Sequence, residues 1–349
     1  MRPLFDPRLV NPPFGDPGVY VDFRFERRAF LLDLGDNTSL FPKKLLRLSH
    51  VFVSHAHMDH FIGFDRLVRV CLGRQTGVHL FGPRGFIAQV EHKLAAYTWN
   101  LVQNYETDFA LTVTEIDGVP ASGETPVRNA RFRSRLRFER EDLPDSAVAG
   151  GVLLEEEGFR VRTALFDHRT PCLGFAIEEK THINVWKNRL LEMGLQTGPW
   201  LKDMKRAVLA GRPDEECVRA WWKDFGVVHE REVALGELKA RALDLVPGQK
   251  ICYVTDVAFH DDNLRRIIEL ASGADLLFIE TVFLDAESGH AREKQHLTAR
   301  QAGTIARAAG ARNLVPFHFS PRYMGREAEL LSELQAAFGG SAHLASTNG

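Results

Sequence analysis

The sequence has few cysteines and no long apolar run, and both absences narrow the classes of protein that it can encode. The four cysteines, Cys71, Cys172, Cys217 and Cys252, are widely spaced and form no Cys-x-x-Cys pair. We therefore expect reduced thiols and neither a disulfide framework nor a zinc knuckle. Without a stretch of about 18 apolar residues, no membrane-spanning helix is expected. Residues 1–7 also lack the apolar core of a signal peptide, so a cytoplasmic location is expected.

The charge balance and the composition bound the class of protein. The 349 residues carry a formal net charge of -2, and 44% of them are hydrophobic while 26% are charged. These fractions are typical of a soluble globular protein with a large core, arranged in one big domain or in two ordinary ones. A net charge near zero excludes a globally basic nucleic-acid-binding protein, so any surface for nucleic acid must be a local patch.

Four potential metal ligands follow one short apolar run. Residues 51–53 predict a buried strand, and His55, His57, Asp59 and His60 come directly after it. Alternate residues of an extended chain face the same side, so His55 and His57 can share one metal. Asp59 and His60 come where the chain turns into a helix, and they could face a second metal roughly 3.5–4 Å from the first. A single His at this place would usually be a packing residue, but packing does not explain four ligands together.

Further residues of the same chemical types follow other predicted strands. They are His168, Asp256, Glu280 and His318, with His296 just before an Ala-rich helix. On its own His168 is weak evidence for a site, and Asp256 could be a helix cap or turn residue. A carboxylate at a strand end that faces several His side chains is, however, suited to bridge two cations. We therefore treat these residues as candidates for the same centre.

The segment of residues 55–60 resembles the His-x-His-x-Asp-His motif of the metallo-β-lactamase superfamily. The complete ordered set resembles ribonuclease Z, the zinc endonuclease family that trims the 3′ side of precursor tRNA. This narrower resemblance rests on residues 275–281 leading to His296-Leu-Thr, on His318-Phe-Ser-Pro-Arg-Tyr, and on Gly-Pro-Trp-Leu-Lys at residues 198–202. It implies an α/β fold, a four-layer αββα sandwich with an inserted helical arm, formed by residues 1–349 as a single domain. The site is expected at the open edge between two sheets.

The resemblance also assigns roles. One metal would be held by His55, His57 and His168, the other by Asp59, His60 and His318, and Asp256 would bridge the two. Asp59 could also take a proton from water activated by the metals. His296 would donate a proton to the leaving oxygen with Glu280 orienting it, while Ser320 and Arg322 would hold a substrate phosphate. Zn²⁺ is expected, with Mn²⁺ or Fe²⁺ as alternatives, because His/Asp sites accept several metals.

Residues 181–245 differ in composition and residue pattern from the rest of the chain. They contain four of the five tryptophans, and helical patches alternate with Gly-Pro breaks. The exposed aromatic and basic side chains expected here, among them Lys187, Arg189, Lys202, Lys205 and Arg206, could form an arm that binds tRNA. A small helical cap or a dimer contact is the alternative. Family members usually dimerise, so the resemblance implies a homodimer.

Two short sequence patterns predict local structure. Residues 131–138 alternate Arg with apolar residues and predict one strand, with either a solvated face or a basic strip for phosphates. The Pro-rich residues 1–18 predict an extended, loop-like lead-in.

Besides the N-terminus, which is Pro-rich where the family has a Gly-rich turn, two segments depart from the family's patterns. The family's Gly-Glu-Gly-Thr-Gln-like turn is Gly-Asp-Asn-Thr-Ser at residues 35–39, and its His-Glu-Ala-Thr segment is Ile-Glu-Thr-Val at residues 279–282. Neither change removes a ligand, but both concern substrate handling. Three functions therefore stay open: an endoribonuclease that processes precursor tRNA, a related phosphodiesterase for small diesters such as cyclic nucleotides, and a metal-bound protein that binds RNA without cutting it. The complete set of ligands and proton donor argues against the third.

Overall fold

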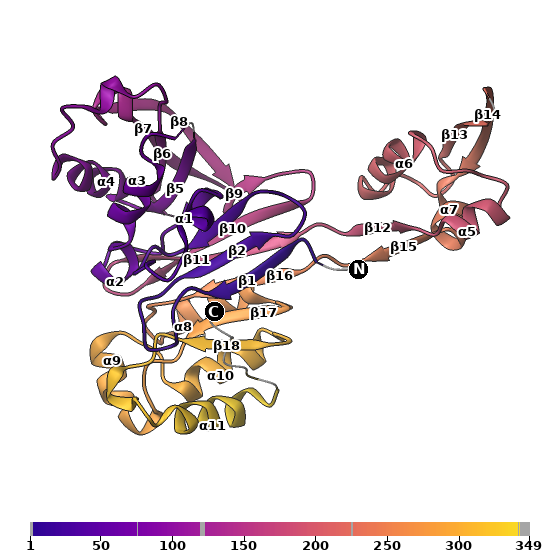
Figure 1. The fold of residues 1–349 in the computed structure, drawn as a ribbon. Coiled ribbons are helices and arrows are strands. Elements are labelled where there is room, and N and C mark those ends of the chain that lie inside the picture. Colours follow the sequence, from indigo (N-terminus) through magenta and orange to yellow (C-terminus); the bar gives the residue numbers. More distant parts are fainter. Residues whose placement is uncertain (1–2, 75, 119–122, 225, 341, 343–349) are drawn as a thin grey trace. The chain divides into compact units, whose positions relative to one another are not determined.

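The structure is a computed structural model that describes residues 3–342 except 75, 119–122, 225 and 341. The chain divides into two compact units (Figure 1). The first combines Met1–Glu178 with Gln249–Gly349, and the second is Glu179–Gly248. Among the described residues, none of the helices has the length and apolar character needed to cross a membrane.

An eight-stranded sheet forms the first half of the large unit. Its strands follow one another in chain order, and the neighbours β3 to β6 are parallel. The strands are β1 (Phe5–Leu9), β2 (Val19–Phe23), β3 (Ala29–Leu32), β4 (Leu48–Phe52), β5 (Gly77–Pro83), β6 (Ala110–Ile116), β7 (Glu124–Arg133) and β8 (Arg140–Ala149). The helices of this half are α1 (Pro42–Leu45), α2 (Met58–Phe61), α3 (Phe64–Cys71) and α4 (Phe86–Ala95).

A six-stranded sheet forms the other half, in the order β18-β17-β16-β11-β10-β9. Its strands are β9 (Val152–Glu155), β10 (Phe159–Asp167), β11 (Pro171–Glu179), β16 (Lys250–Val254), β17 (Leu276–Glu280) and β18 (Leu314–Phe317). Its helices are α8 (Asp261–Ala271), α9 (Ser288–Lys294), α10 (Ala299–Ala308) and α11 (Glu327–Phe338). Because β16, β17 and β18 are parallel, their carboxyl ends meet at one edge of the sheet.

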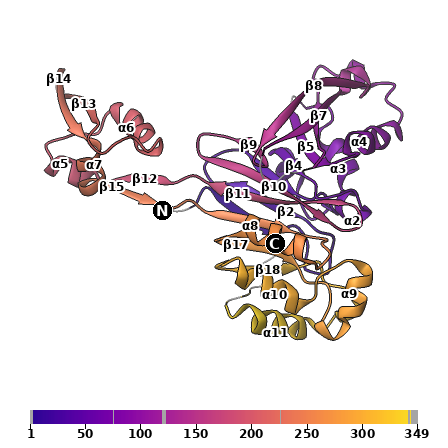
Figure 2. The same ribbon diagram turned by 180° about the vertical axis from the view of Figure 1, so that it is seen from behind.

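Three apolar clusters establish the layers. In β3, Leu31 packs in the cluster with α1 to α4, whereas Phe30 and Leu32 pack between the two sheets. This alternation follows from the period of two residues along a strand. A third cluster joins β16 to β18 with α8, α10 and α11. In both views α10 and α11 lie beyond the six-stranded sheet (Figures 1 and 2). The order is helix, sheet, sheet, helix, so the predicted αββα sandwich is confirmed.

Two local predictions for this unit are right only in part. The proline-rich lead-in contains β1, in which Pro7 pairs with Val21 at the edge of the sheet, where a missing N–H is tolerated. The strand predicted over residues 131–138 ends at Arg133, and a 3₁₀ helix follows over Ser134–Leu136. The reason is Asp108, whose carboxylate accepts hydrogen bonds from the Arg133 guanidinium and, at 3.1 Å, from the backbone N–H of Arg135.

The second unit is the insertion, and it has its own apolar core around Trp200 and Met204. It begins and ends with the antiparallel pair β12 (His182–Val185) and β15 (Leu243–Val246). Its helices are α5 (Lys187–Glu192), α6 (Trp200–Leu209) and α7 (Leu235–Arg241). The sequence did not indicate its hairpin, β13 (Cys217–Asp224) with β14 (Val227–Ala234), because β14 is mostly exposed and lacks an apolar pattern.

Candidate metal centre

The sequence-predicted ligands meet at the carboxyl ends of strands from both sheets. His55, His57, Asp59 and His60 follow β4, His168 lies between β10 and β11, and Asp256 and His318 follow β16 and β18. Asp256 and His318 have φ angles of 47° and 59°, in the left-handed region. Non-glycine residues seldom adopt this conformation, and such strained positions gather at functional sites.

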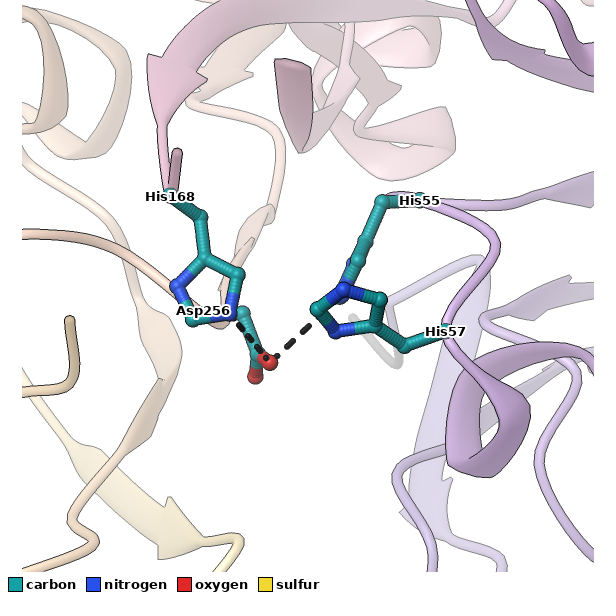
Figure 3. Close-up of side chains that lie close together, drawn as sticks. All are labelled: His55, His57, His168 and Asp256. Carbon is teal, nitrogen blue, oxygen red and sulfur yellow. Dashed lines mark ion pairs between the residues drawn. The ribbon is translucent and has the colours of Figure 1, made fainter. Parts of the chain in front are cut away.

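The first cluster contains His55, His57 and His168, with Asp256 (Figure 3). Asp256 Oδ2 lies 3.5 Å from His55 Nε2 and 3.3 Å from His168 Nε2. One ligand atom from each residue lies within 4.8 Å of all the others. The structure thus brings together the residues predicted for the first metal.

The second cluster contains Asp59, His60 and His318. The other oxygen of Asp256, Oδ1, lies 3.4 Å from His60 Nε2 and 3.0 Å from His318 Nδ1. Asp59 Oδ2 lies 3.2 Å from His318 Nε2 and 3.5 Å from His60 Nε2. Asp256 therefore presents one carboxylate oxygen to each cluster.

The donor atoms fit divalent cations. His55 Nε2, His60 Nε2 and His318 Nδ1 are buried, and each has no hydrogen-bond partner among the described residues. An unsatisfied buried polar atom costs about 1–3 kcal/mol. A cation coordinated by imidazole nitrogens and carboxylate oxygens would satisfy these atoms.

The sequence analysis missed Asp33, which orients His60. His60 Nδ1 donates to Asp33 Oδ2 at 2.7 Å, so its Nε2 is directed at Asp59 and Asp256. Asp33 also accepts the Ser54 backbone N–H at 2.6 Å and the Tyr253 hydroxyl at 2.7 Å. The signal was available, because Asp33 directly follows β3, which runs parallel to β4.

The ring of His168 is oriented in a similar way. Its Nδ1 donates to the Gln295 carbonyl at 2.8 Å, which leaves Nε2 for the first cluster. Such outer hydrogen bonds fix the tautomer of a ligand imidazole and raise its basicity.

The two clusters differ in their electrostatics. Burial lowers the pKa of His55 to about 2, with a further contribution from His60, and burial also lowers the pKa of His57. Burial acts in the same direction on His60, but the carboxylates of Asp256 and Asp33 outweigh it and raise its pKa to about 10. Without a cation, His55 and His57 are therefore neutral, whereas His60 is protonated and, against the effect of burial, the carboxylate of Asp256 likewise raises the pKa of His318.

Glu280 and His296 form a buried ion pair beside the clusters. Glu280 Oε2 accepts from His296 Nδ1 at 2.8 Å, and Oε1 accepts the backbone N–H groups of Val257 and Leu297 at 3.1 and 3.0 Å. Burial opposes ionisation of Glu280, yet His296 holds its pKa at about 2. Burial likewise lowers the pKa of His296, but Glu280 outweighs it and the net shift is upward. The upward shift favours the protonated form of His296.

Ser320 and Arg322 line a pocket of 370 Å³ together with Asp59, His296 and His318. Arg322 donates to Glu287 Oε1 at 2.9 Å, and its guanidinium lies over the Phe283 ring. The structure therefore places both predicted phosphate-binding residues next to the clusters.

The Gly-Asp-Asn-Thr-Ser turn packs directly against the loop that carries the ligands. A Cβ atom on Gly35 would lie 2.4 Å from the Asp59 carbonyl oxygen, and one on Gly63 would lie 2.2 Å from the Gly35 carbonyl oxygen. Both positions require glycine because the two backbones touch. This turn therefore retains the glycine that supports the ligand loop. It differs from the family's turn in the side chains that follow this glycine.

Comparisons with known proteins agree with this architecture. A family model described as the β-lactamase superfamily domain matches residues 241–319. The metallo-β-lactamase fold protein YhfI from Bacillus subtilis superposes with a TM-score of 0.55 at 16% identity, over 99% of this chain and 98% of that one. The short form of human tRNase Z gives a TM-score of 0.53 at 18% identity, over 98% and 95% of the two chains. The fold and the clustered His, Asp and Glu residues define a metal-dependent hydrolase of the metallo-β-lactamase fold.

The closer relationship comes from the sequence. Ribonuclease Z of Deinococcus radiodurans is 32% identical over 334 residues, which cover 94% of this chain and 93% of that protein. The chain belongs to the ribonuclease Z family, as its motifs had indicated.

Proposed function

We propose that the protein is an endoribonuclease that removes the 3′ extension of precursor tRNA at a centre of two divalent metals, with Zn²⁺ as the expected ion. The observation that carries the proposal is the position of Asp256, whose two oxygens face two separate groups of ligands. The names of the relatives, ribonuclease Z and tRNase Z, support the substrate.

The proposed ligands divide as the geometry does. One metal would be held by His55, His57 and His168 and the other by Asp59, His60 and His318, and Asp256 would contribute one oxygen to each group. When bound, two such cations polarise the phosphodiester and lower the pKa of water. Among these ligands, Asp59 is suited to accept a proton from the attacking water. Its side chain is 41% exposed and lines the pocket, whereas that of Asp256 is only 3% exposed.

His296 is the proposed general acid. Glu280 fixes the ring through Nδ1, so Nε2 is available to protonate the 3′ oxygen that leaves the tRNA. The ring centroid lies 5.0 Å from that of His168 and 5.5 Å from that of His318, which places the acid beside both clusters. Ser320 and Arg322 hold the scissile phosphate from the side of the pocket.

The insertion is the proposed tRNA-binding module. Lys187, Lys202 and Lys205 form no salt bridge among the described residues, and Trp186 is 46% exposed with the Arg189 guanidinium 5.2 Å from its ring centroid. Unpaired cations and an exposed aromatic ring in the same compact unit are suited to phosphates and stacked bases. A homodimer, as implied by the family resemblance, is part of the same proposal.

The decisive experiment incubates metal-loaded protein with a 3′-extended tRNA precursor and maps the new ends. Cleavage directly after the acceptor stem, with a 3′ hydroxyl on the tRNA, is the expected result. Hydrolysis of bis(p-nitrophenyl) phosphate and of cyclic nucleotides without precursor cleavage would instead favour the phosphodiesterase for small diesters. Light scattering on the same sample gives the number of chains.

A triple variant tests the insertion. Replacing Lys187, Lys202 and Lys205 by Ala should raise KM for the precursor and leave hydrolysis of the small diester unchanged. The matched control removes three cations that already have carboxylate partners in the same unit, Arg212, Lys239 and Arg241. Equal effects of the two triple variants would contradict a specific role for the unpaired lysines.

A further inference from the structure

The pocket beside the candidate metal centre contains a cation that the proposed mechanism does not use. Lys294, the last residue of α9, lines the 370 Å³ pocket together with Asp59, His296, His318 and Arg322. Its side chain is exposed and, among the described residues, forms no salt bridge. The pocket thus has room for a group next to the scissile phosphate and a free positive charge to bind it.

The other charged residues of the pocket already have partners. Arg322 is bound to Glu287 at 2.9 Å and lies 3.3 Å from His290 Nε2. Asp16 accepts the backbone N–H of Asp36 at 3.0 Å. Lys294 therefore differs from its neighbours, because binding an anion would break no existing contact.

We propose that Lys294 binds the phosphate one nucleotide to the 5′ side of the cleavage site. Lys294 lines the same pocket as His296, the proposed donor to the leaving 3′ oxygen, so both residues can serve the nucleotide that carries this oxygen. That nucleotide occupies the pocket, with its 3′ phosphate at the metals and its 5′ phosphate at Lys294. The inference rests on the proposed function for its direction along the RNA.

The binding test needs no RNA cleavage. Adenosine 3′,5′-bisphosphate and adenosine 3′-monophosphate differ only in the phosphate assigned to Lys294, and calorimetry on metal-loaded protein gives both Kd values. Wild type should bind the bisphosphate about tenfold more tightly, since hydrogen bonds to a charged group contribute more than neutral ones. Lys294→Met should abolish this preference and leave Kd for the monophosphate unchanged, while Lys294→Arg should keep it.

A neighbouring residue supplies the matched control. Arg292 is an exposed cation on the same helix and is not part of the pocket lining. Arg292→Met removes the same charge and should leave the preference for the bisphosphate intact. If Lys294→Met weakens both ligands equally, or if Arg292→Met has the same effect, the subsite is wrong.

Kinetics on the precursor separate this inference from the proposed function. Lys294→Met should raise KM about tenfold with kcat unchanged, and it should reduce the slope of log KM against log salt by about one. Wild type that fails to cleave precursor, yet keeps a Lys294-dependent preference for the bisphosphate, would overturn the function and leave the subsite standing. Precursor cleavage with no Lys294-dependent preference would overturn the subsite alone.

Discussion

The two clusters of the candidate centre share Asp256 but differ in how their ligands are prepared. The first consists of imidazoles, and burial keeps His55 and His57 neutral by lowering their pKa values. The second contains the carboxylate of Asp59 and depends on Asp33, which directs His60 but also raises its pKa. Neutral imidazole can bind a cation at once, whereas a protonated ring must first lose its proton. The first cluster can therefore bind a metal without losing a proton, whereas metal binding at the second cluster depends on pH.

The largest effect is expected from the residue that both clusters share. Asp256→Asn keeps the shape and tolerates the left-handed backbone, but it removes the charge that faces four imidazoles. We expect metal loss from both clusters and a kcat at least about 10⁴-fold lower, as when one member of a catalytic unit is removed. Metal content by plasma mass spectrometry and precursor cleavage measure this. Asp167→Asn, at the exposed carboxylate that ends β10, is the control, and a normal metal content in Asp256→Asn would refute the shared position.

Replacing His296 tests whether this residue is a metal ligand or a general acid. Its ligand-type atoms also lie within 4.8 Å of those of Asp256, Glu280 and His318, so the geometry alone allows it to be a metal ligand. If His296 is a general acid, His296→Ala should lower precursor cleavage about 10²- to 10⁴-fold with metal content unchanged. The loss should be much smaller for bis(p-nitrophenyl) phosphate, because p-nitrophenolate leaves without a proton. Loss of metal in His296→Ala would make it a ligand.

Asp33 should affect only one cluster. Asp33→Asn keeps a side chain that tolerates the φ of 59° but weakens the hydrogen bond that directs His60. Mutation of such an outer partner typically lowers metal affinity 10–100-fold, and we expect this range for the second cluster alone. Chelator competition, with one metal retained and one lost, measures it. Asp36→Asn, at an exposed carboxylate in the adjoining turn, should leave both metals bound.

The same contrast shows what a sequence can predict. The proposed ligands could be found because each is a residue of a distinctive type at the end of an apolar strand, and these are local features. Asp33 was missed because its role depends on which strand lies beside β4, and that pairing is not local. The 3₁₀ turn after Arg133 depends on Asp108, a residue 25 positions away.

Two strands, β1 and β14, were not predicted because their residue patterns oppose the structure that their tertiary contacts impose. Five prolines in residues 1–18 predict a loop, but β1 forms because an edge strand tolerates Pro7 opposite Val21. In the insertion, β14 has few buried residues, and it is a strand because it pairs with β13 along its whole length. In both cases the partner strand, and not the residue pattern, determines the structure.

The smallest expected effect is a difference between the two clusters in the number of protons released when metal binds. His60 has its pKa raised to about 10 and donates Nδ1–H to Asp33, so at pH 7 the proton on Nε2 must leave before that atom binds metal. Affinity of the second cluster should therefore rise with pH towards about 10 and fall as the pH drops, whereas His55, with a pKa of about 2, releases no proton. Titration calorimetry in two buffers of different ionisation enthalpy should show more protons released by the second equivalent of metal than by the first, because His318, whose pKa is also raised, must lose a proton as well. Asp33→Asn removes a charge that raises the pKa of His60 and should reduce this difference. Equal proton release by both equivalents in wild type would mean that the clusters are electrostatically alike.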